Sequence, residues 1–263
     1  MDITLEQLLK GKATKIKDKE FFPTEAYVTP FIEHLSKIKG ITYKCHAELP
    51  KQITITTAED INSIEDITYN RVWIEGVLPE SYIEDNHNRV VGMVYGLDTR
   101  VPLCKFYRGG ENRACTNLCV FDPTDLQVQV LNSKKPINFG TLDYIIQKTS
   151  TLKVFLDNLH NTPFVCSQEN IEQSLGRWID NSIELCYNNG ISKASISAST
   201  IIAAYKLLFK STKSPYYIDI NNGKNTNMFN IYNAFTEIIS NKDKDIMNKA
   251  DKTLLVKDIL GIE

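Results

Sequence analysis

The sequence predicts an α+β fold in which a β-rich N-terminal half, mostly antiparallel sheet, is packed by a helical C-terminal half. Before residue 140, short runs alternate apolar and polar side chains, as in Arg71-Val72-Trp73-Ile74-Glu75, which is typical of a sheet with one wet face. From Thr141 on, apolar residues recur every three or four positions, which is typical of amphipathic helices. We therefore expect an N-terminal helix with a lysine-rich connector over 1–20, a β-rich half over 21–140 and a helical half over 141–263. The two halves should form one structural unit, because a sheet with one apolar face needs helices to cover it.

The elements of the first half follow from this alternation and from its interruptions. A short helix is expected over 3–9. A second helix should begin at Thr29 and Pro30, because proline suits the first helical position, and Gly40 can close it in a left-handed conformation. Gly109-Gly110 lies between two apolar runs and predicts a turn. Strands are expected over 41–49, 52–57, 69–78, 90–97, 103–107, 114–121 and 126–131.

The second half is expected to be helical. One long helix should run from residue 142 to the Asn161-Thr162-Pro163 segment, since proline cannot continue a helix. A second is expected over 171–185, with Asn188-Asn189-Gly190 closing it. Three more are expected over 195–210, 229–239 and 251–260.

Composition excludes several classes of protein. Lysine and arginine total 30 against 32 aspartate and glutamate, for a net charge of −2, which argues against a wholly basic nucleic-acid binder. No apolar run approaches the ~18 residues of a membrane span, so we expect no membrane partner. The first 20 residues lack the apolar stretch of a signal peptide. The six cysteines are therefore expected to be reduced thiols in a cytoplasm.

The motifs of common enzymes are missing from the sequence. It has no phosphate-binding loop, no Gly-x-Ser-x-Gly elbow and no His-Glu-x-x-His, so we assign no catalytic residue and no cofactor. Cys45-His46, Cys104 and the pair Cys115 and Cys119 contain soft ligands, but their spacing does not match a zinc ribbon, and we expect no metal. An enzyme with a scattered site, such as a Mg²⁺-dependent nuclease using Asp98, Glu111 and Glu237, remains as an alternative.

Cations and aromatic rings alternate in the segment 104–117. Arg71, Arg89, Arg100, Arg108 and Arg113 gather around it in a chain that otherwise prefers lysine. Such a mixture suits a protein that grips phosphates while bases stack on rings, here Phe106, Tyr107 or Trp73. It also suits a hairpin in which Arg108 and Arg113 pair with Glu111 or another carboxylate.

A second row of cations lies in the predicted helix over 195–210 and just beyond it. Lys206, Lys210 and Lys213 recur at i, i+4 and i+7 and should share one helix face, although a solvated face has the same pattern. No acidic residue occurs between Glu184 and Asp219. The predicted nucleic-acid-binding residues are therefore Lys105, Tyr107, Arg108, Arg113, Lys206, Lys210 and Lys213.

Two short motifs resemble a known family. The stretch 89–118, with Gly96-Leu97-Asp98 and then Arg113-Ala114-Cys115-Thr116-Asn117, resembles the central segment of the phage- and plasmid-encoded family known as domain of unknown function 932. Tyr232-Asn233-Ala234-Phe235-Thr236-Glu237 resembles its closing signature. The family has no accepted reaction, so the resemblance implies no catalytic residue. It implies a shared site or structural lock in which a helix Asn and Glu hydrogen-bond the guanidinium of Arg113. The residues of this shared site would be Arg113, Cys115, Asn117, Asn233, Thr236 and Glu237.

These observations lead to two functional hypotheses. The first is a phage- or plasmid-type accessory protein that binds nucleic acid, single-stranded by preference, in mobile-element DNA metabolism without enzymatic activity. The alternative is a protein-interaction module, either a virion component or an antagonist of a host defence or replication protein, with a protein partner or a homo-oligomer. The slightly negative net charge favours the alternative. Either protein would work in the host cytoplasm, or in the virion for a virion component.

Overall fold

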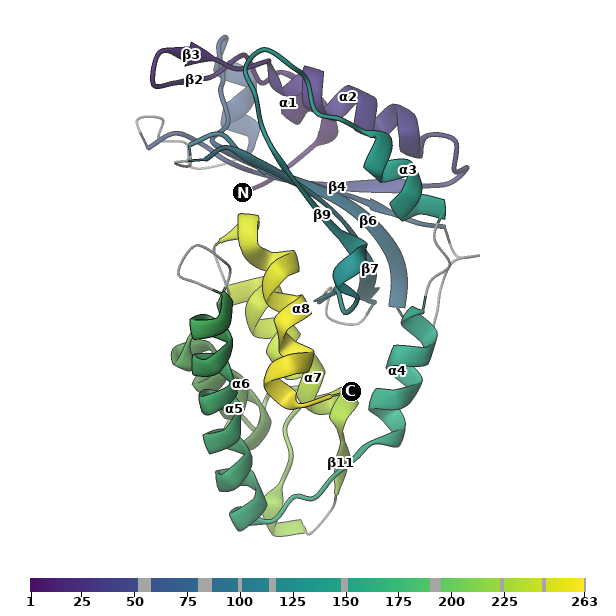
Figure 1. Ribbon diagram of the computed structural model, residues 1–263, viewed down its shortest axis with the longest axis vertical. Helices are drawn as coiled ribbons and strands as arrows, with labels where there is room; N and C mark the ends of the chain where they lie inside the picture. The colour runs from purple at the N-terminus through teal and green to yellow at the C-terminus, as the bar shows by residue number, and fades with distance from the viewer. Residues whose placement is uncertain are drawn as a thin grey trace. The chain divides into compact units, whose positions relative to one another are not determined.

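The computed structural model describes residues 1–51, 58–79, 87–98, 101–113, 117–147, 151–189, 195–222, 225–242 and 245–262 (Figure 1). The chain divides into two compact units. Unit 1 consists of Met1–Ile83, Asn88–Arg108 and Thr124–Thr149, and unit 2 consists of Glu84–His87, Gly109–Pro123 and Ser150–Glu263. Each unit is assembled from several segments, whereas the expected boundaries at residues 20 and 140 are single points along the chain and stay a prediction.

An antiparallel sheet forms the centre of unit 1, and its strands are ordered β1-β4-β5-β6-β7. The pairs β1–β4, β4–β5, β5–β6 and β7–β9 are antiparallel, and β9 lies beside the first half of β7. Sheet in the N-terminal half and helices in the C-terminal half confirm the predicted α+β class. The strands are β1 (Asp2–Ile3), β4 (Thr42–Glu48), β5 (Arg71–Val77), β6 (His87–Gly96), β7 (Leu103–Asn112) and β9 (Leu126–Val130).

One face of this sheet is covered by α1 (Leu5–Leu9), α2 (Thr24–Leu35) and α3 (Gly140–Gln147) (Figure 1). Burying apolar side chains between the layers is the main source of stability here. Phe31 of α2 stacks on Phe106 of β7 with ring centroids 6.4 Å apart. Because side chains alternate along a strand, residues next to Phe106 in β7 point to the opposite face. A hairpin of β2 (Lys15–Ile16) and β3 (Lys19–Glu20) and a 3-10 helix at Ala58–Ser63 complete the unit.

Unit 2 is helical and is built around α7 (Met228–Glu237), of which seven residues are buried. The helix α7 packs against α4 (Leu152–Asn161), α6 (Ala198–Phe209) and α8 (Lys249–Leu260), and α5 (Gln168–Asn189) packs against α6 and α8. Its short strands are β8 (Leu118–Cys119), β10 (Pro163–Phe164) and β11 (Thr226–Asn227), and 3-10 helices lie at Pro123–Asp125 in the connection to unit 1 and at Ile220–Asn222 and Ile246–Asn248. A π-helical segment, Ile238–Lys242, follows α7. Among the helices of the described residues, none is long and apolar enough to cross a bilayer.

Most predicted elements are found, but several boundaries are wrong. Gly109-Gly110 is not a turn, because β7 runs through both glycines to Asn112. The helix expected from Thr29 begins at Thr24 and places Pro30 in its interior, and Gly40 takes the expected positive φ of 88° several residues after that helix ends. The long helix expected from residue 142 is two helices, α3 and α4. The strand expected over 52–57 and part of the one over 114–121 lie outside the described residues.

Candidate functional site

The predicted phosphate-binding side chains of β7 are buried. Lys105, Tyr107 and Arg108 are only 4%, 1% and 3% exposed, and Phe106 is packed against α2. A phosphate-binding group has to be reachable by the nucleic-acid backbone, so the expectation that these residues contact phosphate, or that Phe106 and Tyr107 stack on bases, is corrected. The reason is that Phe106 packs on α2 and Tyr107 bonds to Glu75 of β5, so these side chains are used within unit 1.

Tyr107 instead belongs to a polar cluster on the sheet face opposite the helices of unit 1. Its hydroxyl donates to Oε2 of Glu75 at 2.6 Å and accepts a hydrogen bond from Nε1 of Trp73. Glu75 is itself buried, and a buried carboxylate needs such donors to offset its lost hydration. The indole N–H of Trp73 is therefore already used in a hydrogen bond within the protein. The cluster is a satisfied interior network.

The guanidinium of Arg108 forms a buried ion pair within unit 1. Its Nη2 lies 3.0 Å from Oδ1 of Asp125, and both side chains are almost completely buried. Its Nη1 also donates to the carbonyl of Ile145 in α3. The alternative in which Arg108 pairs with a carboxylate is the one found, although the partner is Asp125. An arginine held in this way ties β7 to the start of β9 and to α3, and it does not present a charge to a ligand.

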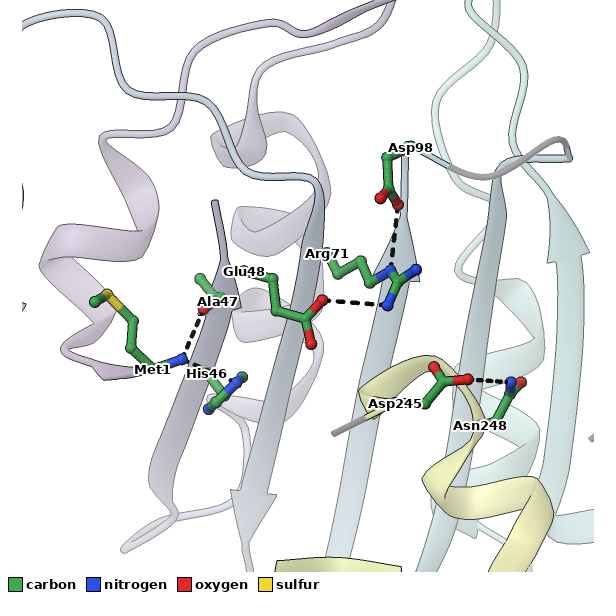
Figure 2. A network of polar contacts seen from close by, with 8 residues as sticks. All are labelled: Met1, His46, Ala47, Glu48, Arg71, Asp98, Asp245 and Asn248. Carbon is green, nitrogen blue, oxygen red and sulfur yellow. Dashed lines mark hydrogen bonds and ion pairs between the residues drawn. The ribbon is translucent and has the colours of Figure 1, made fainter. Parts of the chain in front are cut away.

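Arg71, a second member of the arginine cluster, is also paired with acids (Figure 2). It sits directly opposite Glu48 in the β4–β5 ladder. Its Nη1 donates to Glu48 and its Nε to Asp98, each at 3.3 Å. Arg100 lies outside the described residues. Arg71 and Arg108 are therefore both paired with acids within unit 1.

Among the predicted nucleic-acid-binding residues, the cations that are exposed lie in unit 2. Arg113, Lys206, Lys210 and Lys213 are all exposed. Lys206 lies in the last turn of α6 and Lys210 is its C-cap, so Lys213 follows the end of the helix. The prediction that the three lysines share one helix face is therefore wrong for Lys213.

The two family-like motifs meet through Asn117. Its Nδ2 donates to the carbonyl of Asn233 in α7 at 3.1 Å and to the hydroxyl of Tyr216 at 3.2 Å. Its Oδ1 accepts from Asn241 at 3.3 Å. The amide of Leu118 donates to Oγ of Ser240 in the π-helical segment at 2.8 Å. All four hydrogen bonds connect residues far apart in sequence, and together they lock β8 onto the helical unit.

The other members of the expected motif network have different positions. Thr236 is buried and donates to the carbonyl of Asn233. Glu237 is half-buried and Arg113 is exposed, and no hydrogen bond joins Arg113 to Asn233 or Glu237 in the described part of unit 2. Cys115 lies outside the described residues. The hydrogen bonds expected on the guanidinium of Arg113 are thus corrected, and Asn117 is the residue that links the motifs.

The soft ligands and carboxylates that the sequence offered do not gather into a metal site among the described residues. No group of three or more His, Cys, Asp or Glu side chains gathers there in a way that would hold a metal ion. Burial raises the pKa of the Cys45 thiol to about 12, which keeps it protonated and unreactive. Asp98, a candidate nuclease carboxylate, accepts from Arg71, and Glu111, another, is buried.

A shallow hollow of about 340 Å³ in unit 2 is lined by both apolar and polar side chains. The stacked rings of Phe121 and Phe155, 4.6 Å apart, form its apolar part. Asn158 of α4 and Lys257 of α8 supply an amide and an ammonium group. We assign no chemistry to this hollow.

The outer edge of β9 is a feature that the functional reading of the sequence missed. Within the described part of the chain, β9 pairs only with β7, so its other side is an open sheet edge. Val128 and Val130 are 53% and 67% exposed. The strand reads Leu-Gln-Val-Gln-Val, without a charge or a proline. That uncharged alternation was the available signal, but alternation alone does not distinguish an edge strand from an interior one.

Comparison with known proteins adds no further constraint on this site. No family model, no curated protein and no solved structure matches the chain.

Proposed function

We propose that the protein is a non-enzymatic protein-interaction module that receives a strand of a protein partner along the open edge of β9. The observation that carries the proposal is the exposure of Val128 and Val130 on an uncharged edge strand. The burial of Lys105, Tyr107 and Arg108 also favours this function over nucleic-acid binding. The resemblance to the domain of unknown function 932 family would place such a module in a phage or plasmid, as a virion component or as an antagonist of a host protein.

The direction of the backbone groups in β9 supports strand addition. Hydrogen-bonded and non-hydrogen-bonded pairs alternate along an antiparallel ladder. The amide of Leu131 donates to the carbonyl of Pro102 at 2.8 Å. Because the direction alternates from one residue to the next, Gln129 and Gln127, two and four positions before Leu131, also direct their backbone N–H and C=O groups toward β7. Val128 and Val130 therefore direct their N–H and C=O groups away from the sheet, toward an added strand.

The composition of this edge also differs from that of a protected edge. Soluble proteins usually protect an open edge with lysine, proline, a bulge or a covering element, because the unpaired backbone groups otherwise pair with other chains. None of the first three occurs within β9, whose residues are Leu126, Gln127, Val128, Gln129 and Val130. An unprotected edge that persists in a folded protein is explained most simply by a partner strand.

A selection from a random peptide library on the purified chain tests this function. We expect extended peptides rich in β-branched residues that bind the wild-type chain and bind the Val128→Pro variant at least about tenfold more weakly, since the lost hydrogen bonds and the proline ring each disfavour an added strand. Proline at 128 removes only an outward N–H, so the β7–β9 ladder keeps its bonds. Val128→Thr retains the N–H and the branched side chain, and it should bind normally. Peptides that bind all three proteins equally would reject the proposal, as would the absence of any binder at concentrations at which the chain is monomeric.

Nucleic-acid binding remains as a second candidate on a smaller set of residues. The observation in its favour is that Arg113, Lys206, Lys210 and Lys213 are all exposed in unit 2. Fluorescence anisotropy with a single-stranded oligonucleotide at ~50 mM salt tests it, because binding through phosphates weakens steeply as salt rises. The Lys206→Glu, Lys210→Glu and Lys213→Glu triple variant should then lose the binding. If the wild-type chain shows no anisotropy change at that salt concentration, this candidate is rejected.

A further inference from the structure

We infer that the partner strand at this edge is β9 of a second copy of this chain, paired antiparallel about a twofold axis at Val128. The inference rests on the proposed function and names its partner. It follows from three properties of β9. Its backbone N–H and C=O groups alternate in direction, its side chains match those of a second copy, and it carries no charge.

The direction of the backbone N–H and C=O groups determines which residues can face each other in such a pair. Leu126, Val128 and Val130 direct their N–H and C=O groups outward, and Gln127 and Gln129 direct theirs toward β7. In an antiparallel pair, residues that exchange both hydrogen bonds lie directly opposite each other. With the axis at Val128, Val128 faces its own copy and Leu126 faces Val130 of the other chain. All three outward-facing residues of each strand then form hydrogen-bonded pairs.

Neighbouring registers lose part of this pairing. If the axis moves by one residue to Gln127, Leu126 faces Val128 of the other copy, and Val130 passes beyond the end of the partner strand. If the axis lies at Gln129, Leu126 passes beyond the end of the partner strand. A register that opposes an outward-facing residue to an inward-facing one breaks the ladder altogether. The axis at Val128 is therefore the register with the most hydrogen bonds.

The side chains of β9 match themselves in the same register. Leu126, Val128 and Val130 share the sheet face of Lys105 and Tyr107, because they sit opposite these residues in the β7–β9 ladder or two positions away. Apolar side chains thus face apolar side chains across the axis, and β-branched cross-strand pairs stabilise a sheet. On the other face, Gln127 lies opposite Gln129 of the second copy. Each Gln129 amide is already engaged with Asn138, by bonds to the carbonyl and from the amide nitrogen.

The absence of charge makes self-pairing permissible. A charged residue near a twofold axis meets its own copy, and like charges directly opposite each other destabilise a strand pair. Residues Leu126–Val130 carry none. Such a contact is isologous, since the same surface is used by both chains, and it closes at two copies. The result is one sheet that continues across two unit-1 sheets, with no open β9 edge left.

Sedimentation equilibrium tests the dimer and its site. We expect the wild-type chain to approach twice its mass of 29.9 kDa as its concentration rises, with unchanged behaviour for Val128→Thr. Val128→Lys places two ammonium groups at the axis and should shift the equilibrium to monomer, as should Val128→Pro. Circular dichroism of both variants checks that they fold. A wild-type monomer at all concentrations, or a dimer that persists in the folded Val128→Lys variant, would overturn the inference.

Engineered cysteines test the register itself, in a Cys186→Ser background that removes an exposed thiol. Facing Cα atoms in a hydrogen-bonded pair lie about 5.5 Å apart, within the range of a disulfide, so Val128→Cys should form a disulfide-linked dimer under mild oxidation. Val130→Cys alone should not, because the two copies of residue 130 would lie about 14 Å apart. Combining Leu126→Cys with Val130→Cys should restore the crosslink. The reverse pattern would exclude this register.

The two proposals fail in different ways. If selected peptides bind the wild-type edge and not Val128→Pro, while the chain stays monomeric and Val128→Cys does not crosslink, the interaction function stands and the partner is another protein. If neither peptides nor a second copy use the edge, both proposals fall.

Discussion

Tyr107 on β7 donates its phenolic hydrogen to the carboxylate of Glu75 on β5, although β6 lies between these two strands. The residue of β6 directly opposite Glu75 is Gly92. A Cβ atom at position 92 would lie 2.0 to 2.2 Å from ring atoms and the hydroxyl of Tyr107. The tyrosine therefore crosses the middle strand by lying over a glycine, and this arrangement connects three strands on one face.

Gly92→Ala should be strongly destabilising for this reason. Distances of 2.0 to 2.2 Å are far inside van der Waals contact, so either the Tyr107 ring must leave its place or β6 must move. Overpacking of this kind costs about 1–3 kcal/mol, and displacement of the ring also breaks its bond to the buried Glu75. Urea unfolding followed by circular dichroism measures the loss.

Gly176→Ala is the matched control for that substitution. Gly176 lies inside α5, where nothing is found within 4 Å of an added Cβ. Alanine there should stabilise the chain by about 0.5–1 kcal/mol, since glycine is a poor helix former. If Gly92→Ala lowers the stability no more than Gly176→Ala does, the position of the Tyr107 ring over Gly92 is wrong.

The buried ion pair of Arg108 and Asp125 predicts a non-additive pair of substitutions. The charged groups lie 3.0 Å apart and almost fully out of water. Removing one charge leaves the other buried and uncompensated, which costs about 3–5 kcal/mol. We expect Arg108→Met and Asp125→Ala each to lose stability on this scale, and the double variant to lose less than the sum. A double-mutant cycle from urea unfolding measures the coupling. Additive losses would contradict the pairing.

The fold class and most elements were predictable because they follow from local periodicity. The alternation around Trp73 specifies β5, and the apolar stripe of residues 171–185 specifies α5. Gly109-Gly110 was misread because glycine has two uses that look alike in sequence. A Cβ at Gly109 would lie 2.3 Å from the carbonyl oxygen of Cys119, and one at Gly110 would lie 2.9 Å from Leu152. These glycines allow close packing, and only the tertiary structure distinguishes that use from a turn.

The candidate site was less predictable because the exposure of a side chain depends on long-range contacts. The aromatic and cationic pattern around Tyr107 suits either a ligand surface or a buried network, and the network depends on a bond to Glu75, 32 positions away. The partner of Arg108 could not be chosen from sequence, because several acids were equally available. The contact of Asn117 with Asn233 spans 116 positions. Only the resemblance brought these two residues together, and it suggested Arg113 as the link.

Asn117→Ala should destabilise unit 2. Asn117 is buried and makes three hydrogen bonds to Asn233, Tyr216 and Asn241. Alanine leaves buried partners without their bond, at about 1–3 kcal/mol for each group that stays unsatisfied. Asn158→Ala is a control, since Asn158 is exposed on α4 and surface changes usually stay within about 0.5 kcal/mol. Thermal unfolding compares the two variants, and equal melting temperatures would show that the Asn117 network is not stabilising.

Stability should fall at alkaline pH because buried acids of the core resist ionisation. Burial raises the pKa of Cys45 from 9.0 to about 12 and that of Tyr69 from 10.0 to about 12. At pH 7.5 these groups are protonated in both the folded and the unfolded chain, whereas at pH 9.0 the Cys45 thiol of the unfolded chain is already half ionised. Above pH 9 the unfolded chain releases protons that the folded chain retains, and the free energy of unfolding decreases until about pH 12. Urea midpoints at pH 7.5, 9.0 and 10.5 should therefore decrease in that order.

Tyr43→Phe tests whether buried hydroxyls cause part of this decrease. Burial raises the pKa of Tyr43, and its hydroxyl is buried with no hydrogen-bond partner among the described residues. Phenylalanine therefore removes a buried polar group without breaking a bond, and stability at pH 7.5 should stay equal or rise. Because phenylalanine cannot ionise in either state, the decrease from pH 9.0 to pH 10.5 should become smaller. A Tyr43→Phe variant that is less stable at pH 7.5, or that loses stability with pH as steeply as the wild-type chain, would show that this hydroxyl has a partner or ionises freely.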